Sequence, residues 1–318
     1  MKAVRNTADG IRVLEVPEPA DRNGVPPVEV TVVSTAICGS DLHLMAMGPS
    51  PVTPGHEFAG LLPDGTPVAV RPYLPCDACD QCAAGAGQLC RTGGERLLGV
   101  AIDGGMAERV RVDPGALFPL VDTSGAGVDP RDGALVEPLA VALHGLNRAG
   151  VTAGRRVLVI GGGPIGLCAV AAARHLGADV DLTEPRPHRA EAGEALGARI
   201  RATGEYDTVL DAAAVQSSFD LAVAHLRPRG TLGLLGTFWT PVAMDYTTQM
   251  KEITIVPAFM YGHHHGAPEF AQATDILRAV PDLPRVLITH RFPLDEAARA
   301  FAVAQDPAAA AIKVVLEP

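Results

Sequence analysis

The 318-residue sequence has no long apolar run and no excess of positive charge. No apolar stretch approaches the roughly 20 residues that a membrane-spanning helix requires. Acidic residues outnumber Lys and Arg by 36 to 26, which gives a formal net charge of −10 at pH 7 and an isoelectric point near 5.4. Nucleic acids and anionic membranes select clustered positive charge. We therefore expect neither as a partner, and a small molecule instead.

The N-terminal segment MKAVRNTADG lacks the apolar core of a signal peptide, so we expect a cytoplasmic protein whose thiols stay reduced. Four of the six cysteines fall within fifteen residues. In a reducing compartment such a cluster indicates a metal site rather than disulfides. The cysteines are Cys38, Cys76, Cys79, Cys82, Cys90 and Cys168.

Two patterns of secondary structure divide the chain, whose length allows two domains. Up to about residue 115, short alternating segments such as VEVTVVST are broken by Gly, Pro and Asp, which is typical of a β-rich, barrel-like domain. From about residue 155, strand and helix patterns alternate, which predicts a doubly wound parallel sheet and hence an α/β fold. The last segment has a mixed pattern that fits either domain. No repeat, low-complexity tract or linker is apparent.

The sequence IGGGPIGL at residues 160–167 follows a strand-like segment and opens an apolar helix. In G-x-G-x-x-G, the first glycine permits a tight turn, the second lets a pyrophosphate approach the backbone, and the third packs helix against strand. The helix N-terminus offers free N–H groups to the anion. The pattern predicts a dinucleotide site, with a purely structural turn as the alternative. The expected cofactor contacts here are Gly161, Gly163, Pro164, Ile165 and Gly166.

Glu184 stands eighteen residues after Gly166, at the end of the next strand-like segment. A carboxylate there is placed to accept hydrogen bonds from the adenosine ribose and to repel the 2′-phosphate of NADP. NAD is therefore favoured over NADP. Arg186 and Arg189 leave an alternative, because either can attract that phosphate, lie against the adenine ring or form a solvated helix start. We expect Arg189 to contact the cofactor.

Two groups of residues are candidates for metal binding. The spacing C-x2-C-x2-C-x7-C of Cys76, Cys79, Cys82 and Cys90 can close a tetrahedral shell around zinc, which is typical of a structural site. An iron–sulfur cluster uses the same atoms and is the alternative. The second group can bind zinc with a position left for substrate, although core packing and turns also explain such residues. This group comprises Cys38, His56, Glu57 and Glu137.

Six motifs occur in the order found in zinc-dependent medium-chain dehydrogenases/reductases, and the chain resembles that family over nearly its whole length. They are CGSDLH, GHEFAG, the four-cysteine segment, EPLAVALHG, GGGPIG and AIKVVLEP. The resemblance implies a GroES-like catalytic domain over residues 1–145, a Rossmann domain over 146–262 and a return to the catalytic domain over 263–318. It also implies two zinc ions, one catalytic and one structural, and a homodimer or homotetramer.

The resemblance also implies roles for individual residues. Cys38 and His56 are expected to bind the catalytic zinc. Glu137 replaces the second cysteine of the liver-type enzymes, as in the branch that resembles sorbitol and threonine dehydrogenases. We expect either Glu57 or Glu137 to bind the metal directly, with the other one shell further out.

Three further positions match the family. Ser40 and His43 stand where the family relays a proton from the substrate hydroxyl to solvent, a step for which the pKa of histidine is suited. Lys313 stands where a basic residue reaches the cofactor pyrophosphate.

The expected activity is hydride transfer between NAD and an alcohol, with zinc as Lewis acid. Apolar residues in the segments that line the family's cleft favour a medium-sized or cyclic secondary alcohol: Met45, Phe238, Trp239, Met260 and Tyr261. A polyol, aminocyclitol or amino-alcohol dehydrogenase is the alternative. The non-enzymatic alternative is a zinc-containing protein that binds nucleotides or senses redox state.

Short spacings predict a trimmed wall of the substrate cleft. Only twelve residues separate His43 from His56, and eighteen separate Glu57 from Cys76. The histidines at 263–265 are expected in an exposed loop, because adjacent histidines cannot all face one ion.

Overall fold

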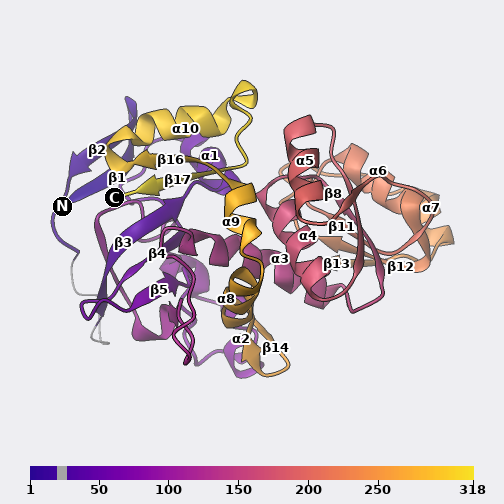
Figure 1. Cartoon of the computed structure of the whole chain (residues 1–318), viewed down its shortest axis with the longest axis horizontal. Coiled ribbons are helices and arrows are strands. Elements are labelled where there is room, and N and C mark those ends of the chain that lie inside the picture. The colour runs from indigo at the N-terminus through magenta and orange to yellow at the C-terminus, as the bar shows by residue number, and fades with distance from the viewer. Residues whose placement is uncertain (20–26) are drawn as a thin grey trace. The chain divides into compact units, whose positions relative to one another are not determined.

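The computed structural model describes residues 1–19 and 27–318, which form two compact units (Figure 1). The first unit comprises Met1–Glu137 and Ile288–Pro318, and the second comprises Pro138–Leu287. The α/β class, with one β-rich domain and one parallel-sheet domain, is confirmed. No helix in the described ranges is both long and apolar enough to cross a membrane.

In the first unit, the described residues contribute seven strands to one sheet, in the order β16-β17-β3-β4-β5-β7 with β6 also paired to β3. All pairs are antiparallel except β16 with β17, and β1 and β2 form a separate antiparallel pair. The strands are β1 (Lys2–Thr7), β2 (Gly10–Glu15), β3 (Val28–Ala36), β4 (Glu57–Leu61), β5 (Pro67–Val70), β6 (Arg109–Val112), β7 (Leu117–Pro119), β16 (Ile288–Pro293) and β17 (Lys313–Glu317).

Helices in this unit are short and mostly single turns. The α-helices are α1 (Gly39–Ala46), α2 (Asp80–Ala83) and α10 (Ala297–Gln305). The 3-10 helices are η1 (Gly87–Leu89), η2 (Gly93–Arg96), η3 (Pro114–Ala116), η4 (Gly133–Leu135), η5 (Leu294–Glu296) and η6 (Pro307–Ala309). Alternation along β3 buries Val30 and Val32 against Phe58, Val68 and Val110, which forms one apolar core of the unit.

The second unit contains a parallel sheet of six strands among the described residues, in the order β10-β9-β8-β11-β12-β13. This is the strand order 3-2-1-4-5-6 of the dinucleotide-binding fold, with its switch point between β8 and β11. Val157, Leu158 and Val159 in β8 are fully buried, as expected for a strand covered on both faces. The strands are β8 (Arg156–Ile160), β9 (Asp179–Thr183), β10 (Arg199–Ile200), β11 (Tyr206–Asp211), β12 (Leu226–Leu234) and β13 (Thr254–Pro257).

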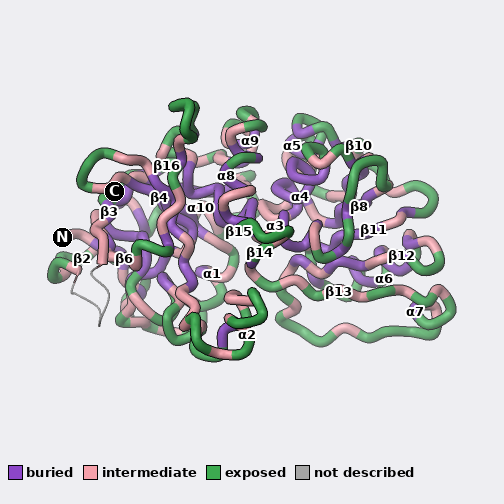
Figure 2. Tube along the Cα trace, turned by 90° about the horizontal axis from the view of Figure 1, so that it is seen from below, coloured by how far each residue is buried: buried purple, intermediate pink, exposed green. Residues whose placement is uncertain are grey.

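Helices and a small hairpin complete the second unit, and buried residues fill the inside of each unit (Figure 2). Helix α4 packs on β8 and β9, α5 packs on β9 and β10, and α6 packs on β11 and β12. The hairpin consists of β14 (His263–His264) and β15 (Ala267–Pro268). The helices are α3 (Val136–Arg148), α4 (Pro164–His175), α5 (Pro187–Ala195), α6 (Gln216–His225), α7 (Tyr246–Met250), α8 (Glu269–Ala279) and α9 (Asp282–Leu287).

The boundaries of the two units differ from those expected from the sequence. Residues 263–287, assigned there to the C-terminal return, pack with the parallel-sheet unit. Glu269 at the start of α8 is buried, pairs with His144 Nδ1 at 2.7 Å and accepts a hydrogen bond from Asn147 at 2.8 Å. Helix α9 packs against α4 and α5. The return to the first unit therefore begins only at Ile288.

Candidate metal and dinucleotide sites

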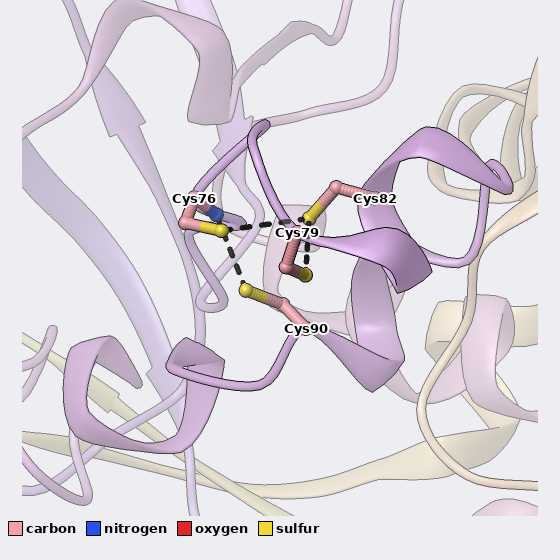
Figure 3. Close-up of side chains that lie close together, drawn as sticks. All are labelled: Cys76, Cys79, Cys82 and Cys90. Atoms are coloured by element: carbon pink, nitrogen blue, oxygen red, sulfur yellow. Dashed lines mark hydrogen bonds between the residues drawn. The ribbon is translucent and has the colours of Figure 1, made fainter.

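The four cysteines of the loop after β5 bring their sulfur atoms together (Figure 3). The Sγ–Sγ distance is 3.5 Å between Cys79 and Cys82 and 4.0 Å between Cys76 and Cys82. All four sulfurs, including that of Cys90, lie within 4.8 Å of one another. Tetrahedral zinc with Zn–S bonds of about 2.3 Å requires sulfurs roughly 3.8 Å apart. The donor set and its spacing therefore fit a closed structural zinc site.

The backbone of the loop favours thiolates. The N–H groups of Cys76 and Thr92 lower the pKa of Cys90 to about 6. Burial and the neighbouring Cys79 sulfur instead raise the pKa of Cys82 to about 11. Backbone N–H groups thus favour the thiolate at Cys90, whereas burial disfavours it at Cys82.

A second group gathers Cys38, His56 and Glu57, whose ligand atoms lie within 4.8 Å of one another. Cys38 follows β3 and precedes α1, whereas His56 and Glu57 stand at the start of β4. The antiparallel register of β3 with β4 pairs Ala36 with Glu57 and thus brings these segments together. Thiolate, imidazole and carboxylate are ligands suited to zinc in a site that keeps a position open.

A close approach of backbones fixes the residue before His56. Gly55 has φ +99°, a conformation that favours glycine, and a Cβ there would lie 2.7 Å from Met106 Cγ. Gly99 packs against the backbone of Gly55, where a Cβ would come within 2.5 Å. The glycine of the GHE sequence is therefore required by packing around the site.

Asp41 belongs to this group although it was not selected from the sequence. Its Oδ2 accepts a hydrogen bond of 2.9 Å from the Cys38 backbone N–H, and its Oδ1 lies 3.5 Å from His56 Nδ1. Burial opposes a charge on His56, but the negative charges of Asp41 and Cys38 outweigh burial and hold the pKa of His56 well above its usual value. An acidic residue three positions after the helix N-cap was the available signal.

The two glutamates and Lys313 are placed as follows. The carboxylate of Glu57 is in the group, whereas Glu137, buried in the first turn of α3, is not among the ligands within that distance. Lys313 Nζ donates to Glu57 Oε1 at 2.9 Å and Oε2 at 2.7 Å, and both side chains are buried. The ammonium of Lys313 thus pairs with Glu57 inside the first unit, and its contact with a cofactor pyrophosphate stays a prediction.

The two relay candidates lie on α1. Ser40 Oγ is 3.4 Å from His56 Nε2. His43 is exposed in the last turn of the helix, and its Nδ1 lies 2.8 Å from the Gly39 carbonyl oxygen. Ser40 is thus next to the metal group, and His43 is open to solvent.

The glycine loop follows β8 at the switch point of the parallel sheet. Gly161 has φ +97°, and a Cβ on Gly166 would overlap the Gly161 carbonyl oxygen. Pro164 and Ile165 form the first turn of α4 after the N-cap residue Gly163. This is the arrangement in which backbone N–H groups at a helix start face a phosphate.

Glu184 and two arginines border this loop. Glu184 Oε2 accepts a hydrogen bond of 2.7 Å from the Gly162 N–H, and Oε1 accepts one of 2.8 Å from the Arg186 N–H. Arg189 Nη1 lies 3.8 Å from the position of a Cβ on Gly163. Burial and the charge of Arg186 lower the pKa of Arg189, whereas Glu184 raises it. Both a carboxylate and a guanidinium therefore lie at the loop.

The residues expected to line an apolar pocket do not share one environment. Tyr261 is fully buried and contacts the Phe270 ring at 5.2 Å between centroids, so it is a core residue of the second unit and not a pocket wall. Met45 packs on the core of the first unit, whereas Trp239 is 54% exposed. The residues 263–265 form part of the β14–β15 hairpin, and no metal-binding group of the described residues includes them.

Two family models match the chain: residues 26–122 match the alcohol dehydrogenase GroES-like domain, and residues 164–278 match the zinc-binding dehydrogenase family. L-Galactonate-5-dehydrogenase of Escherichia coli K12 is 30% identical over 311 residues, 88% of this chain and 87% of that protein. The structure of galactitol-1-phosphate dehydrogenase from Escherichia coli has a TM-score of 0.86 at 29% identity, covering 100% of both chains.

A zinc-binding dehydrogenase from Sinorhizobium meliloti 1021, solved with NADP, has a TM-score of 0.86 at 30% identity, covering 100% of this chain and 99% of that one. These matches extend over both units and agree with the two cysteine-containing groups and the glycine loop. The chain therefore belongs to the zinc-dependent medium-chain dehydrogenase/reductase family and is a zinc-dependent oxidoreductase acting on alcohols.

Proposed function

We propose that the enzyme oxidises a secondary hydroxyl group of a polyhydroxylated substrate, such as a sugar alcohol or sugar acid, or reduces the corresponding ketone. The relatives are named for reactions at internal carbons of such molecules, for example L-galactonate-5-dehydrogenase and galactitol 1-phosphate 5-dehydrogenase. The sequence favoured an apolar or cyclic alcohol. The burial of Tyr261 removes one of the side chains on which that preference rested.

The grouping of Cys38, His56 and Glu57 carries the proposal. These residues would hold the catalytic zinc ion, which supplies Lewis-acid polarisation of the substrate hydroxyl, while a bound nicotinamide supplies the hydride acceptor. Asp41 orients His56 through its carboxylate. Glu137 would act one shell out, because its carboxylate lies outside the group.

Proton transfer is assigned to α1. Ser40 Oγ, which lies 3.4 Å from His56 Nε2, would accept the proton of the substrate hydroxyl while passing its own hydroxyl proton through the nicotinamide ribose toward His43. His43 in the last turn is exposed and would release that proton to solvent. The first turn of α1 thus faces the metal ligands, and its last turn faces water.

For the dinucleotide, NAD is proposed as the preferred cofactor. The two hydrogen bonds that Glu184 accepts use one acceptor site on each oxygen, and a carboxylate has about four, so ribose hydroxyls can still bind. The same charge would repel a 2′-phosphate. Arg186 and Arg189 would attract that phosphate, which keeps NADP as the alternative.

A second copy of the chain is proposed as a protein partner. Strand β13 is an edge of the parallel sheet, and β12 is its only strand partner among the described residues. Large apolar side chains are exposed in the segments just before and after β13: Tyr246 at 70%, Met250 at 75% and Phe259 at 60%. An open edge with apolar flanks favours symmetric pairing with an identical edge.

The substrate proposal is tested by following absorbance at the reduced-nicotinamide band with zinc-replete enzyme. A panel of linear sugar alcohols and sugar acids is compared with cyclic alcohols of similar size, first with NAD and then with NADP. We expect the highest kcat/KM for a polyhydroxylated substrate with NAD. A clear preference for cyclohexanol-like substrates would return the assignment to the apolar class.

A further inference from the structure

A buried carboxylate in the second unit closes the segment between β13 and α8. Glu269, the first residue of α8, is 1% exposed. Its Oε2 accepts a hydrogen bond of 2.7 Å from the Gly262 N–H and lies 2.7 Å from His144 Nδ1. Its Oε1 accepts a hydrogen bond of 2.8 Å from Asn147 Nδ2. The carboxylate therefore joins the start of α8 both to α3 and to the end of the segment that follows β13.

The charge of this carboxylate is retained inside the protein. Burial raises the pKa of Glu269, but hydrogen bonds from His144 and its other two partners outweigh burial and hold that pKa below its usual value. Glu269 is thus ionised at neutral pH. A buried charge with its partners is often no more stabilising than apolar side chains of similar volume. The network is therefore better explained by the geometry that it fixes than by added stability.

The segment that the network holds reverses the chain after β13. We call residues 258–262 the β13 turn. At its start, the Ala258 N–H donates to the Leu234 carbonyl oxygen at 3.1 Å, which continues the pairing of β13 with β12. Met260 then adopts φ +54°, a left-handed conformation that is unfavourable for a residue with a side chain. Such a conformation persists only where the surrounding structure holds it.

The far end of the β13 turn is anchored on α8. Tyr261 is fully buried, and its ring centroid lies 5.2 Å from that of Phe270. The Gly262 carbonyl oxygen accepts a hydrogen bond of 2.9 Å from the Glu269 backbone N–H, while the Gly262 N–H donates to the Glu269 side chain. Both backbone groups of Gly262 are thus bound by one residue, directly after the strained part of the turn.

The β13 turn lies at the carboxyl end of its strand, in the second half of the parallel sheet. Strands β8, β9 and β10 form one mononucleotide-binding half, and β11, β12 and β13 form the other. The glycine loop and Glu184 belong to the first half, where the adenosine is expected. Because ligands of this fold bind at the carboxyl ends of the strands, the nicotinamide half of the cofactor is expected at the second half.

We propose that Glu269, supported by His144 and Asn147, is a positioning residue that holds the β13 turn in the conformation that receives the nicotinamide half of the dinucleotide. The inference rests on the proposed function for the identity of the dinucleotide, and it is independent of the alcohol that is oxidised. The adenosine half is held by the glycine loop and does not depend on Glu269.

The test compares the dissociation constants of NADH and of ADP-ribose, which lacks the nicotinamide, for the zinc-loaded full chain. Fluorescence of the reduced nicotinamide reports NADH, and calorimetry reports ADP-ribose. Glu269→Met removes both oxygens and should weaken NADH binding by about 10-fold, the lower end of the effect of losing a hydrogen bond to a charged group. It should change ADP-ribose binding less than about twofold, because the glycine loop stays intact.

Two further variants sharpen the comparison. Glu269→Gln should bind NADH within about threefold of wild type, because its oxygen can accept from Gly262 and His144 while its NH2 group donates to a rotated Asn147 amide. Asp275→Asn is the matched control, since Asp275 is an exposed carboxylate of the same helix, paired with Arg278 at 2.8 Å. It should leave both dissociation constants unchanged.

The outcomes separate positioning from a general structural role. Wild-type NADH binding by Glu269→Met, or equal weakening of NADH and ADP-ribose, would overturn the proposal. If Glu269→Met fails to fold, Asn147→Leu decides, because it removes only the bond to Oε1: selective weakening of NADH supports the proposal, and unchanged binding overturns it. Inactivity of wild type on every alcohol, with the expected difference between NADH and ADP-ribose, would overturn the proposed function alone.

Discussion

Replacing Asp41 with asparagine should weaken metal binding at the Cys38 site. The Asp41 carboxylate, which is 1% exposed, uses one oxygen for the Cys38 backbone N–H and has the other 3.5 Å from His56 Nδ1. An asparagine keeps one oxygen but replaces the other with an NH2 group. It therefore cannot accept from both neighbours and has no charge with which to orient the imidazole.

The expected size follows from the lost contact. A hydrogen bond to a charged group contributes about 1.5 to 3 kcal/mol. A tenfold change in a binding constant corresponds to about 1.4 kcal/mol, so the loss amounts to roughly a 10- to 100-fold drop in metal affinity. The same range is observed when residues supporting a metal ligand are replaced in other proteins.

Competition with a zinc chelator measures this affinity, with metal content determined for the Cys38 site and the four-cysteine site separately. Asp295→Asn is the control, because Asp295 is an exposed carboxylate of the same unit, paired with Lys2 at 2.7 Å. It should retain both metals as wild type does. Equal retention in Asp41→Asn and wild type would refute the orienting role of Asp41.

Four further outcomes are expected. Cys82→Ala should lose one zinc equivalent and lower Tm while the open site keeps its metal, as elemental analysis and thermal unfolding would show, because structural zinc contributes folding free energy. Glu184→Ala should lower the preference for NAD, measured as kcat/KM with NAD divided by kcat/KM with NADP. An increase in this ratio would contradict the contact between Glu184 and the ribose. Asp181 is buried and hydrogen-bonded to Tyr206 and Arg199, and these partners hold its pKa below the usual value despite burial. The ionised carboxylate therefore stabilises the folded state above the pKa that Asp181 has in the unfolded chain. This stabilisation is lost as the pH falls through the pKa of Asp181 in the folded protein. Asp181→Asn should cost about 1–3 kcal/mol in urea unfolding at pH 7 and less at pH 3, and a cost independent of pH would refute this. Met250→Glu should convert an oligomer to monomer in light scattering, and an unchanged mass would exclude this flank of β13 from the interface.

Features that depend on local spacing could be predicted from the sequence. The four cysteines lie within one loop, so their spacing alone indicated a closed zinc shell, and the glycine run between strand and helix predicted the turn seen after β8. The grouping of Cys38, His56 and Glu57 depended on the family resemblance, because strand pairing brings these segments together.

Features that depend on distant contacts were missed. The Lys313–Glu57 pair joins residues 256 positions apart, and it requires β17 to lie beside β3. Tyr261 was expected at a pocket because its segment is apolar, but nothing in that segment indicated that the ring packs on Phe270. The end of the second unit was placed too early because the contacts of Glu269 with α3 leave no local signal.

The most direct test of zinc-dependent alcohol oxidation at the Cys38 site compares turnover and metal content of wild type and Cys38→Ala on the best substrate of the panel. Wild type should contain two zinc equivalents per chain and reduce the nicotinamide cofactor. Cys38→Ala should remain folded, keep the zinc of the four-cysteine site and lose about 1000-fold or more in kcat, because the metal supplies several kcal/mol of transition-state stabilisation. Turnover by Cys38→Ala at the wild-type rate would contradict catalysis at this site.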